Sequence, residues 1–176
     1  MNRAARIFLI GPMGAGKTTI GRHLAELLGV AFQDTDSEIV QRTGADVPLI
    51  FEIEGEPGFR RRETAVLEEL TTRDGVVLAT GGGAVLAEQN REYLRRGVVV
   101  YLQASIDTLL ARTQRDRSRP LLQDGDRRAK LEQILREREA LYRATADIVV
   151  STDQRSPQAV AQEIVAKLTD IRHANA

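Results

Sequence analysis

The residues best suited to chemistry lie in one short stretch near the N-terminus. Residues 11–18 read Gly-Pro-Met-Gly-Ala-Gly-Lys-Thr, and they directly follow the apolar residues 7–10. This fits the pattern G-x-x-x-x-G-K-[ST] between a buried strand and a helix. The glycines allow the backbone to fold into a cup of inward-pointing N–H groups, and the helix N-terminus adds partial positive charge. The stretch therefore predicts a polyphosphate-binding loop.

Two side chains at the end of this loop carry the expected chemistry. Lys17 can reach the terminal phosphates of a nucleotide as a point charge. The Thr18 hydroxyl can ligate Mg²⁺. The alternative is a glycine-rich turn with an exposed lysine, and the strand-loop-helix context favours the phosphate site.

Two aspartates stand where a second strand is expected to end. Asp34 and Asp36 follow residues 30–33, and they point the same way only if that segment is still extended. The third expected strand, 76–79, is followed by threonine and glycine, so Asp34 is the nearest candidate for holding Mg²⁺ through water. Asp36 is then free to accept a hydrogen bond from a hydroxyl acceptor or to take its proton. Either aspartate could instead merely cap the following helix.

Arginines supply candidate contacts to an anion. Arg138 takes an apolar slot in the inward stripe of the expected helix 127–143. It could be a snorkelling side chain or the partner of a neighbouring glutamate, but a bound anion explains it at least as well. Arg60 begins three consecutive arginines, which could equally form a solvated helix face. Together with Asp36 and the glycines 81–83, these arginines suggest a small acceptor that carries both an anion and hydroxyls.

The segment 114–126 is polar, charged and flanked by expected helices, and it predicts a mobile lid. Its arginines Arg115, Arg117 and Arg119 are spaced at i and i+2. One of them could swing onto the transferring phosphoryl group as an arginine finger in cis. An ordinary solvated loop is the alternative.

Strands alternating with helices must position these residues. The pattern predicts strands at 7–10, 30–33, 76–79, 98–102 and 146–150. It predicts helices at 18–28, 37–42, 47–53, 59–73, 87–96, 105–113, 127–143 and 156–168. It also predicts a break at 54–58 and frayed residues after 168. This is an α/β fold with a parallel sheet and helices on both faces. Because ligands bind at the carboxyl ends of such strands, the loop, the aspartates and the triple glycine should share one cleft.

Composition narrows the function classes. The 176 residues fit a single domain spanning 1–176. Acidic and basic residues balance at 25 each, so no global field attracts nucleic acid or an anionic membrane. Cysteine is absent, which excludes disulfides and thiolate metal sites. The N-terminal apolar run is too short for a signal peptide or a membrane span, so we expect a soluble, cytoplasmic protein.

Taken together, the motifs closely resemble those of the shikimate kinase family. The matching segments, in the family's order and spacing, are Gly11 to Thr18, Asp34-Thr-Asp36, Gly55-Glu-Pro-Gly-Phe-Arg60-Arg-Arg-Glu63, Gly81-Gly-Gly83, Arg119-Pro-Leu121 and Glu137-Arg138 through Leu141-Tyr142. The resemblance implies ATP-dependent phosphorylation of the 3-hydroxyl of shikimate, giving shikimate 3-phosphate and ADP, in aromatic amino acid biosynthesis. It also implies a monomer with a three-layer P-loop kinase fold, strand order 2-3-1-4-5, similar to nucleoside monophosphate kinases.

The resemblance assigns roles residue by residue. The implied ATP-binding set is Gly14, Ala15, Gly16, Lys17, Thr18, Thr19, Arg112, Arg119 and Arg155. The implied shikimate-binding set is Asp36, Arg60, Gly82 and Arg138. The implied catalytic residues are Lys17, Asp36 and Arg119. One Mg²⁺ per subunit accompanies ATP, with Thr18 as ligand and Asp34 acting through water. The acceptor-binding segment is then about 34–62, and the lid about 114–126.

Two alternatives stay open on the sequence alone. The first is another small-metabolite kinase, acting on gluconate or a nucleoside monophosphate, and the combination of Asp36, Arg60 and Arg138 argues against the nucleotide acceptor. The second is a non-catalytic nucleotide-binding regulator that keeps the fold. Each expected catalytic position retains a competent side chain, which argues against that regulator.

Overall fold

The computed structural model of the protein describes residues 6–114 and 126–174. Five parallel strands form its centre in the order β2-β3-β1-β4-β5. They are β1 (Arg6–Ile10), β2 (Ala31–Asp34), β3 (Val76–Ala79), β4 (Val98–Gln103) and β5 (Ile148–Ser151). The predicted α/β fold class, with its strand order, is confirmed. The predicted lid at 114–126, including Arg119, lies almost wholly outside the described residues.

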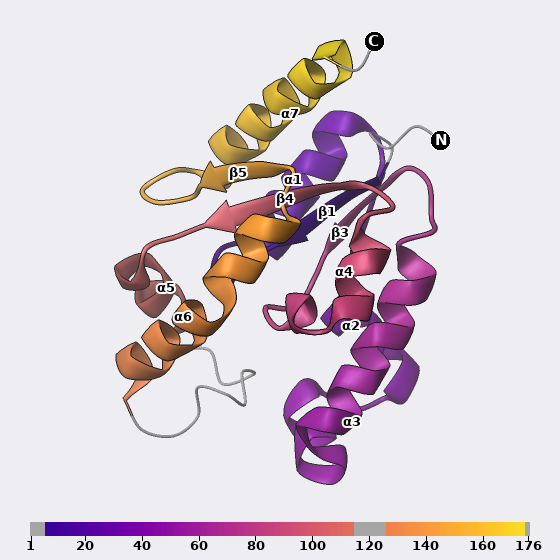
Figure 1. The fold of residues 1–176 in the computed structure, drawn as a ribbon, viewed down its shortest axis with the longest axis vertical. Coiled ribbons are helices and arrows are strands. Elements are labelled where there is room, and N and C mark those ends of the chain that lie inside the picture. The colour runs from indigo at the N-terminus through magenta and orange to yellow at the C-terminus, as the bar shows by residue number, and fades with distance from the viewer. Residues whose placement is uncertain (1–5, 115–125, 175–176) are drawn as a thin grey trace.

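Helices cover both faces of this sheet (Figure 1). The helices are α1 (Lys17–Leu28), α2 (Thr35–Thr43), α3 (Val47–Leu70), α4 (Glu88–Leu94), α5 (Ile106–Thr113), α6 (Arg127–Thr145) and α7 (Pro157–Ala174), together with the short 3₁₀ helix η2 (Ala84–Leu86). Successive strand residues point to opposite faces, so each of the inner strands β3, β1 and β4 contributes to two separate cores. This explains why the inner strands are apolar throughout rather than alternating.

The two cores make the three layers. Ile7 and Leu9 of β1 pack with α1, α5 and α7 on one face. Phe8 and Ile10 pack with α2, α3 and α4 on the other. Helix α6 joins both, through Leu131 on the first face and Tyr142 on the second. This double burial fixes β1 at the centre of the sheet, and with it the position of the loop that follows.

Several predicted boundaries were wrong for identifiable reasons. Helix α2 begins at Thr35 rather than 37, because the Asp34 side chain caps it by accepting a hydrogen bond from the Ser37 N–H at 3.1 Å. Helix α7 continues to Ala174 instead of fraying after 168, since Ile171 still packs against the core. The break predicted at 54–58 is a sharp kink within α3, with non-helical dihedral angles at Gly55.

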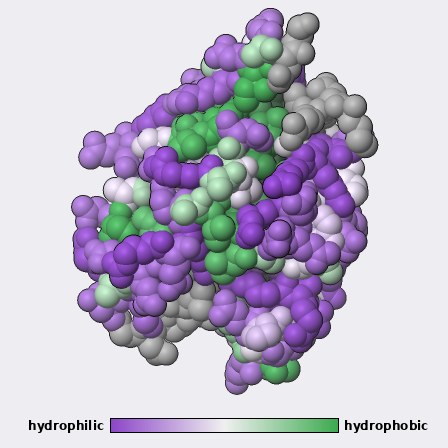
Figure 2. All heavy atoms as spheres, viewed as in Figure 1, coloured by the Kyte–Doolittle hydropathy of each residue, from purple (hydrophilic) through white to green (hydrophobic). Residues whose placement is uncertain are grey.

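One face of the molecule is mostly hydrophilic. Figure 2 shows polar and charged residues over most of the visible face, with hydrophobic residues emerging between them. The exposed large hydrophobic residues of the described chain are Leu27, Leu49, Ile53 and Leu86. Within residues 6–114 and 126–174, no helix has the length and apolar character needed to cross a membrane.

Candidate functional site

The phosphate-binding loop predicted from the sequence joins β1 to α1. Gly11, Gly14 and Gly16 all have positive φ angles, of 146°, 83° and 95°. A Cβ on Gly11 would lie 2.6 Å from the Leu102 carbonyl oxygen, which no real side chain tolerates. Gly16 caps α1 without any side chain, so the first N–H groups of the helix face whatever occupies the loop. The backbone therefore has the build of an anion site.

Lys17 is folded back over this loop. Its side chain is buried, and its ammonium donates to the carbonyls of Gly11 at 2.6 Å and Pro12 at 2.9 Å. The cation is thus held within the loop itself, where a bound polyphosphate would compete with these two carbonyls for it. Ala15 is buried beside it, whereas Thr18 and Thr19 are exposed on the first turn of α1.

The predicted metal pair is in contact. The Thr18 hydroxyl donates to Oδ2 of Asp34 at 2.8 Å, while the other oxygen of Asp34 caps α2. The capping role that the sequence left open for this aspartate is therefore observed, and its second oxygen lies against the predicted metal ligand Thr18. Thr18 and Asp34 offer only oxygen atoms, which suits a hard cation such as Mg²⁺. Among the described residues no three His, Cys, Asp or Glu side chains gather as a cage, so such an ion would need phosphate and water oxygens as further ligands.

A cleft of about 550 Å³ opens beside the loop and the end of β2. Its lining includes Thr18, Asp34, Asp36, Arg60, Gly82 and Arg138. The structure thus brings all four predicted acceptor-binding residues together with the predicted metal pair. Asp36 lies in the first turn of α2 rather than on an extended strand, so the condition under which the two aspartates would point the same way is not met.

An ion network occupies the floor of this cleft. The Arg60 guanidinium donates to Glu63 at 3.0 Å and to Glu56 at 3.1 Å. The Glu63 side chain is fully buried, and burial raises its pKa, although Arg60 and Arg138 oppose that shift. Burial alone would lower the pKa of Arg60, but the two glutamates outweigh it and raise the pKa. Arg60 is therefore a fixed cation.

Arg138 differs from Arg60 in having no carboxylate partner among the described residues, although the Nε of Arg60 also lacks a hydrogen-bond partner there. It is only 4% exposed, and its Nε and Nη1 atoms have no hydrogen-bond partner among the described residues. A buried donor without a partner costs free energy, which an anion in the cleft would recover. The alternative partner Glu139 is engaged elsewhere: it accepts from Arg143 at 2.7 Å and from the Tyr101 hydroxyl. The inward arginine predicted from the helical stripe is thus observed.

The triple glycine supplies space. A Cβ on Gly83 would lie 2.4–2.6 Å from the Arg60 guanidinium, and one on Gly81 would lie 2.7 Å from the Glu63 carboxylate. Glycine at these positions lets the charged groups approach the backbone closely. The Gly82 carbonyl accepts a hydrogen bond from the Tyr142 hydroxyl. Burial raises the pKa of Tyr142 to about 12, so that hydroxyl stays protonated and remains a donor.

The sequence analysis missed two of these roles. Glu63 was noted only as part of a motif, and its full burial beside Arg60 could not be seen in the string. Its position three residues after Arg60 was the available signal, since such pairs share a helix face. Tyr142 was also noted only as part of a motif, and its contact with Gly82 joins segments 60 residues apart.

The two expected adenine-side arginines lie at different distances from the loop. Arg112 donates to the carbonyls of Gly14 at 3.1 Å and Ala15 at 3.0 Å, and also to the Thr152 carbonyl. Arg155 instead turns toward α7, where it pairs with Glu163 at 2.5 Å. The structure therefore puts Arg112 against the loop and Arg155 farther along the same edge, beyond β5.

Known proteins are similar to this chain in sequence and in fold. The family model described as shikimate kinase matches residues 13–169. A shikimate kinase of Thioalkalivibrio sulfidiphilus is 58% identical over 93% of this chain and 87% of its own, and one of Shewanella amazonensis is 53% identical over 96% and 99%. The solved shikimate kinase of Acinetobacter baumannii, in complex with shikimate, superposes with a TM-score of 0.93 at 53% identity, covering 94% of this chain and 93% of its own. The chain therefore belongs to the shikimate kinase family.

Proposed function

We propose that this protein transfers the γ-phosphoryl group of ATP to the 3-hydroxyl of shikimate, giving shikimate 3-phosphate and ADP for aromatic amino acid biosynthesis. The observation that carries the proposal is Arg138, which lines a cleft that also reaches the phosphate loop and whose buried Nε and Nη1 have no hydrogen-bond partner in the part of the chain that the structure describes. A carboxylate acceptor satisfies those donors. The Acinetobacter relative, 53% identical, was solved with shikimate bound.

The nucleotide half of the proposed site holds the triphosphate. Residues 14–19 surround the β- and γ-phosphates, and Lys17 leaves its two loop carbonyls to neutralise them. Arg112 and Arg155 serve the adenine side, and Arg119 of the lid covers the transferring group. Thr18 would ligate one Mg²⁺ per subunit, and Asp34 would hold it through water. When bound, the ion neutralises phosphate charge.

The acceptor half of the proposed site holds shikimate by its carboxylate and aligns one hydroxyl. Arg138 and Arg60 bind the carboxylate, with Glu63 and Glu56 keeping the Arg60 guanidinium in place. Asp36 accepts the hydrogen bond of the reacting hydroxyl and takes its proton as the oxygen attacks phosphorus. Gly82 lets the acceptor lie directly against the backbone. Catalysis is then mostly positioning and charge stabilisation.

The same proposal covers the organisation of the chain. Residues 1–176 form one shikimate-kinase-like domain, with an acceptor-binding segment at about 34–62 and a lid at about 114–126 that closes to exclude water. The protein works as a cytoplasmic monomer and engages neither nucleic acid nor membrane. Its balanced charge and mostly hydrophilic surface support this.

A coupled ADP-release assay with Mg-ATP tests the proposal. It compares shikimate with gluconate, AMP and no acceptor. We expect ADP release that depends on shikimate alone. Activity with gluconate or AMP and none with shikimate would overturn the acceptor assignment while keeping the kinase. Nucleotide binding without transfer to any acceptor would replace the enzyme with a regulator.

A further inference from the structure

Helix α3 consists of two pieces that meet at Gly55. This residue has φ 71° and ψ 176°, a backbone conformation that essentially only glycine adopts. Pro57 follows two residues later and supplies no N–H to the helix. The piece before the kink, 47–54, and the piece after it, 56–70, therefore have independent directions, and something must fix the angle between them.

The two pieces line different parts of the cleft. The first contributes Val47, Pro48 and Phe51 to its wall. The second contributes Arg60 and Glu63 to its charged floor. The angle at Gly55 therefore sets how closely the apolar wall approaches an acceptor held by the floor.

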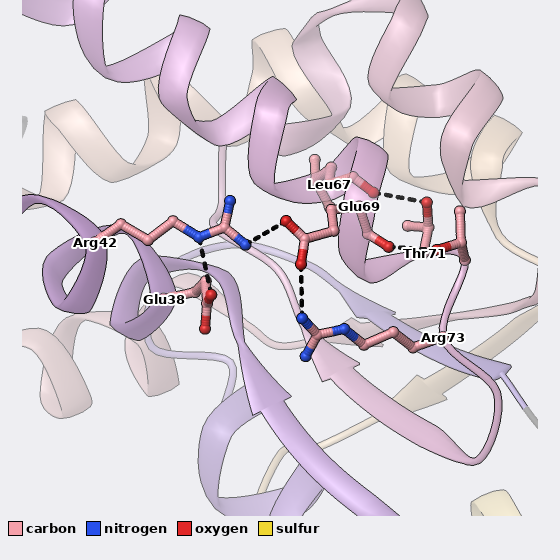
Figure 3. A network of polar contacts seen from close by, with 7 residues as sticks. Glu38, Arg42, Leu67, Glu69, Thr71 and Arg73 are labelled. Atoms are coloured by element: carbon pink, nitrogen blue, oxygen red, sulfur yellow. Dashed lines mark hydrogen bonds and ion pairs between the residues drawn. The ribbon is translucent and has the colours of Figure 1, made fainter.

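The second piece is firmly anchored. Val66, Leu67 and Leu70 are buried against the sheet. Figure 3 shows a further attachment. Arg42 of α2 forms ion pairs with Glu38 of the same helix at 2.9 Å and with Glu69 of α3 at 2.6 Å. Arg73 also pairs with Glu69, at 2.7 Å. This half of α3 is thus bound both to the core and to α2.

The first piece is attached more weakly. Ile50 is buried in the core cluster and the Phe51 ring lies 5.0 Å from that of Phe59 across the kink. The opposite side of this piece faces solvent, with Ile53 72% exposed and Leu49 41% exposed. Hydrophobic contacts of this kind attach the first piece to the core, but because they are not directional they do not fix its angle relative to the second piece.

One ion pair spans the kink directly. Arg62 donates from Nε to both oxygens of Glu54, at 3.1 and 3.0 Å, and from Nη2 to Oε1 at 2.6 Å. Glu54 is the last residue before Gly55, and Arg62 lies two turns later on the anchored piece. A Cβ on Gly58 would lie 2.4 Å from the Glu54 Cβ, so the glycine allows the two pieces to close tightly under this pair. The planar guanidinium makes the contact directional.

We propose, resting on the proposed function, that Glu54 and Arg62 are positioning residues that fix the kink of α3 and so set the affinity for the acceptor. Neither side chain lines the cleft with Arg60 and Arg138. They act through Phe51 and Val47, whose distance from the floor they control. The Phe51–Phe59 contact limits the effect of losing them to a graded loss of affinity.

Steady-state kinetics provide the first test. Arg62→Ala and Glu54→Gln should each raise the shikimate KM about two- to fivefold, the range expected for an exposed ion pair, and leave the ATP KM unchanged. Arg62→Lys should recover part of the loss, and the charge swap Glu54→Arg with Arg62→Glu should recover more than either reversed residue alone. The matched control is Arg73→Ala, which removes an α3 ion pair that does not cross the kink. An unchanged shikimate KM, or equal rises for both substrates, would overturn the proposal.

A distance measurement tests the kink without relying on catalysis. The chain has no cysteine, so Glu52→Cys and Glu68→Cys place two spin labels at exposed positions on either side of Gly55. We expect one narrow distance distribution with Arg62 present and a broader one after Arg62→Ala. Identical distributions would overturn the proposal. If the wild-type protein does not phosphorylate shikimate, the proposed function fails, but this measurement still decides whether the pair fixes the kink.

Discussion

The phosphate loop and the acceptor cleft lie on the same edge of the sheet, but they are built in opposite ways. The loop is a single run of residues between β1 and α1, shaped by positive-φ glycines at 11, 14 and 16. The cleft is assembled from α2, α3, α6 and the glycines after β3, and side-chain charges give it its character. One site is a local property of the chain, and the other exists only in the folded protein.

This difference should make the affinity for the nucleotide independent of the affinity for the acceptor. The loop acts through backbone groups and Lys17, which are indifferent to the acceptor. The cleft acts through Arg60 and Arg138, which α3 and α6 supply rather than the loop. We therefore expect substitutions on each side to change one ligand's binding or the chemical step, and to leave the other ligand alone.

The largest effect should come from Lys17→Ala. Removing the ammonium that neutralises the transferring phosphate should lower kcat about 10³-fold or more, with little change in the KM for shikimate. Steady-state assays with both substrates varied measure this. Lys167→Ala, on α7, is the control and should keep wild-type turnover. A near wild-type kcat in Lys17→Ala would remove the loop from the chemistry.

Arg138→Met should give the next largest effect, on the other side of the comparison. Methionine keeps much of the side chain's volume but loses the charged hydrogen bonds, so the shikimate KM should rise about 10- to 100-fold. The ATP KM should stay within a factor of two. Arg138→Lys should restore part of the affinity, because it returns the charge without the planar donors. Equal rises in both KM values would argue against a carboxylate contact.

Gly83→Ala should have a smaller effect by displacing Arg60. The added Cβ would lie 2.4–2.6 Å from a guanidinium that Glu56 and Glu63 hold in place, so the arginine must shift. We expect a shikimate KM raised about three- to tenfold, somewhat more than a single net hydrogen bond is worth. The control is Gly75→Ala, where the added Cβ has open space around it although φ is positive, and it measures the effect of replacing a glycine without displacing a neighbouring side chain. An unchanged KM would show that Arg60 can move without cost.

The smallest expected effect is a pH dependence of stability due to Glu63. Burial raises the pKa of the Glu63 carboxyl group above 4.5, so this group keeps its proton to higher pH in the folded protein than in the unfolded chain. Its contribution to stability is therefore full below the unfolded pKa and is lost as the pH rises through the folded pKa. The free energy of unfolding of the wild type, minus that of Glu63→Gln, should fall as the pH rises above the ordinary glutamate pKa of 4.5. A difference that rises over this range would mean that the Arg60 pair dominates; Glu52→Gln controls for loss of an exposed carboxylate.

The sequence predicted well what depends on neighbouring residues. The strand, glycine loop and helix around Lys17 form a local motif, and each glycine is required by its own backbone angle. The inward position of Arg138 also followed from helical periodicity alone, because the apolar stripe of α6 points at the sheet. The parallel sheet followed from the alternation of elements.

What the sequence could not give depends on tertiary contacts. The burial of Glu63 requires α3 to lie against the triple glycine, and the end of α7 requires Ile171 to meet the core. The kink at Gly55 looked like a broken helix, since the Glu54–Arg62 pair that spans it is invisible in a local pattern.

The most direct test of the two-part site is titration calorimetry of ATP and of shikimate against Lys17→Ala and Arg138→Met. We predict that Lys17→Ala binds shikimate as the wild type does, and that Arg138→Met binds ATP as the wild type does while its shikimate affinity falls about 10- to 100-fold. If Arg138→Met weakened both ligands equally, or if Lys17→Ala lost shikimate binding, the two halves would not be separately built and the account would be contradicted.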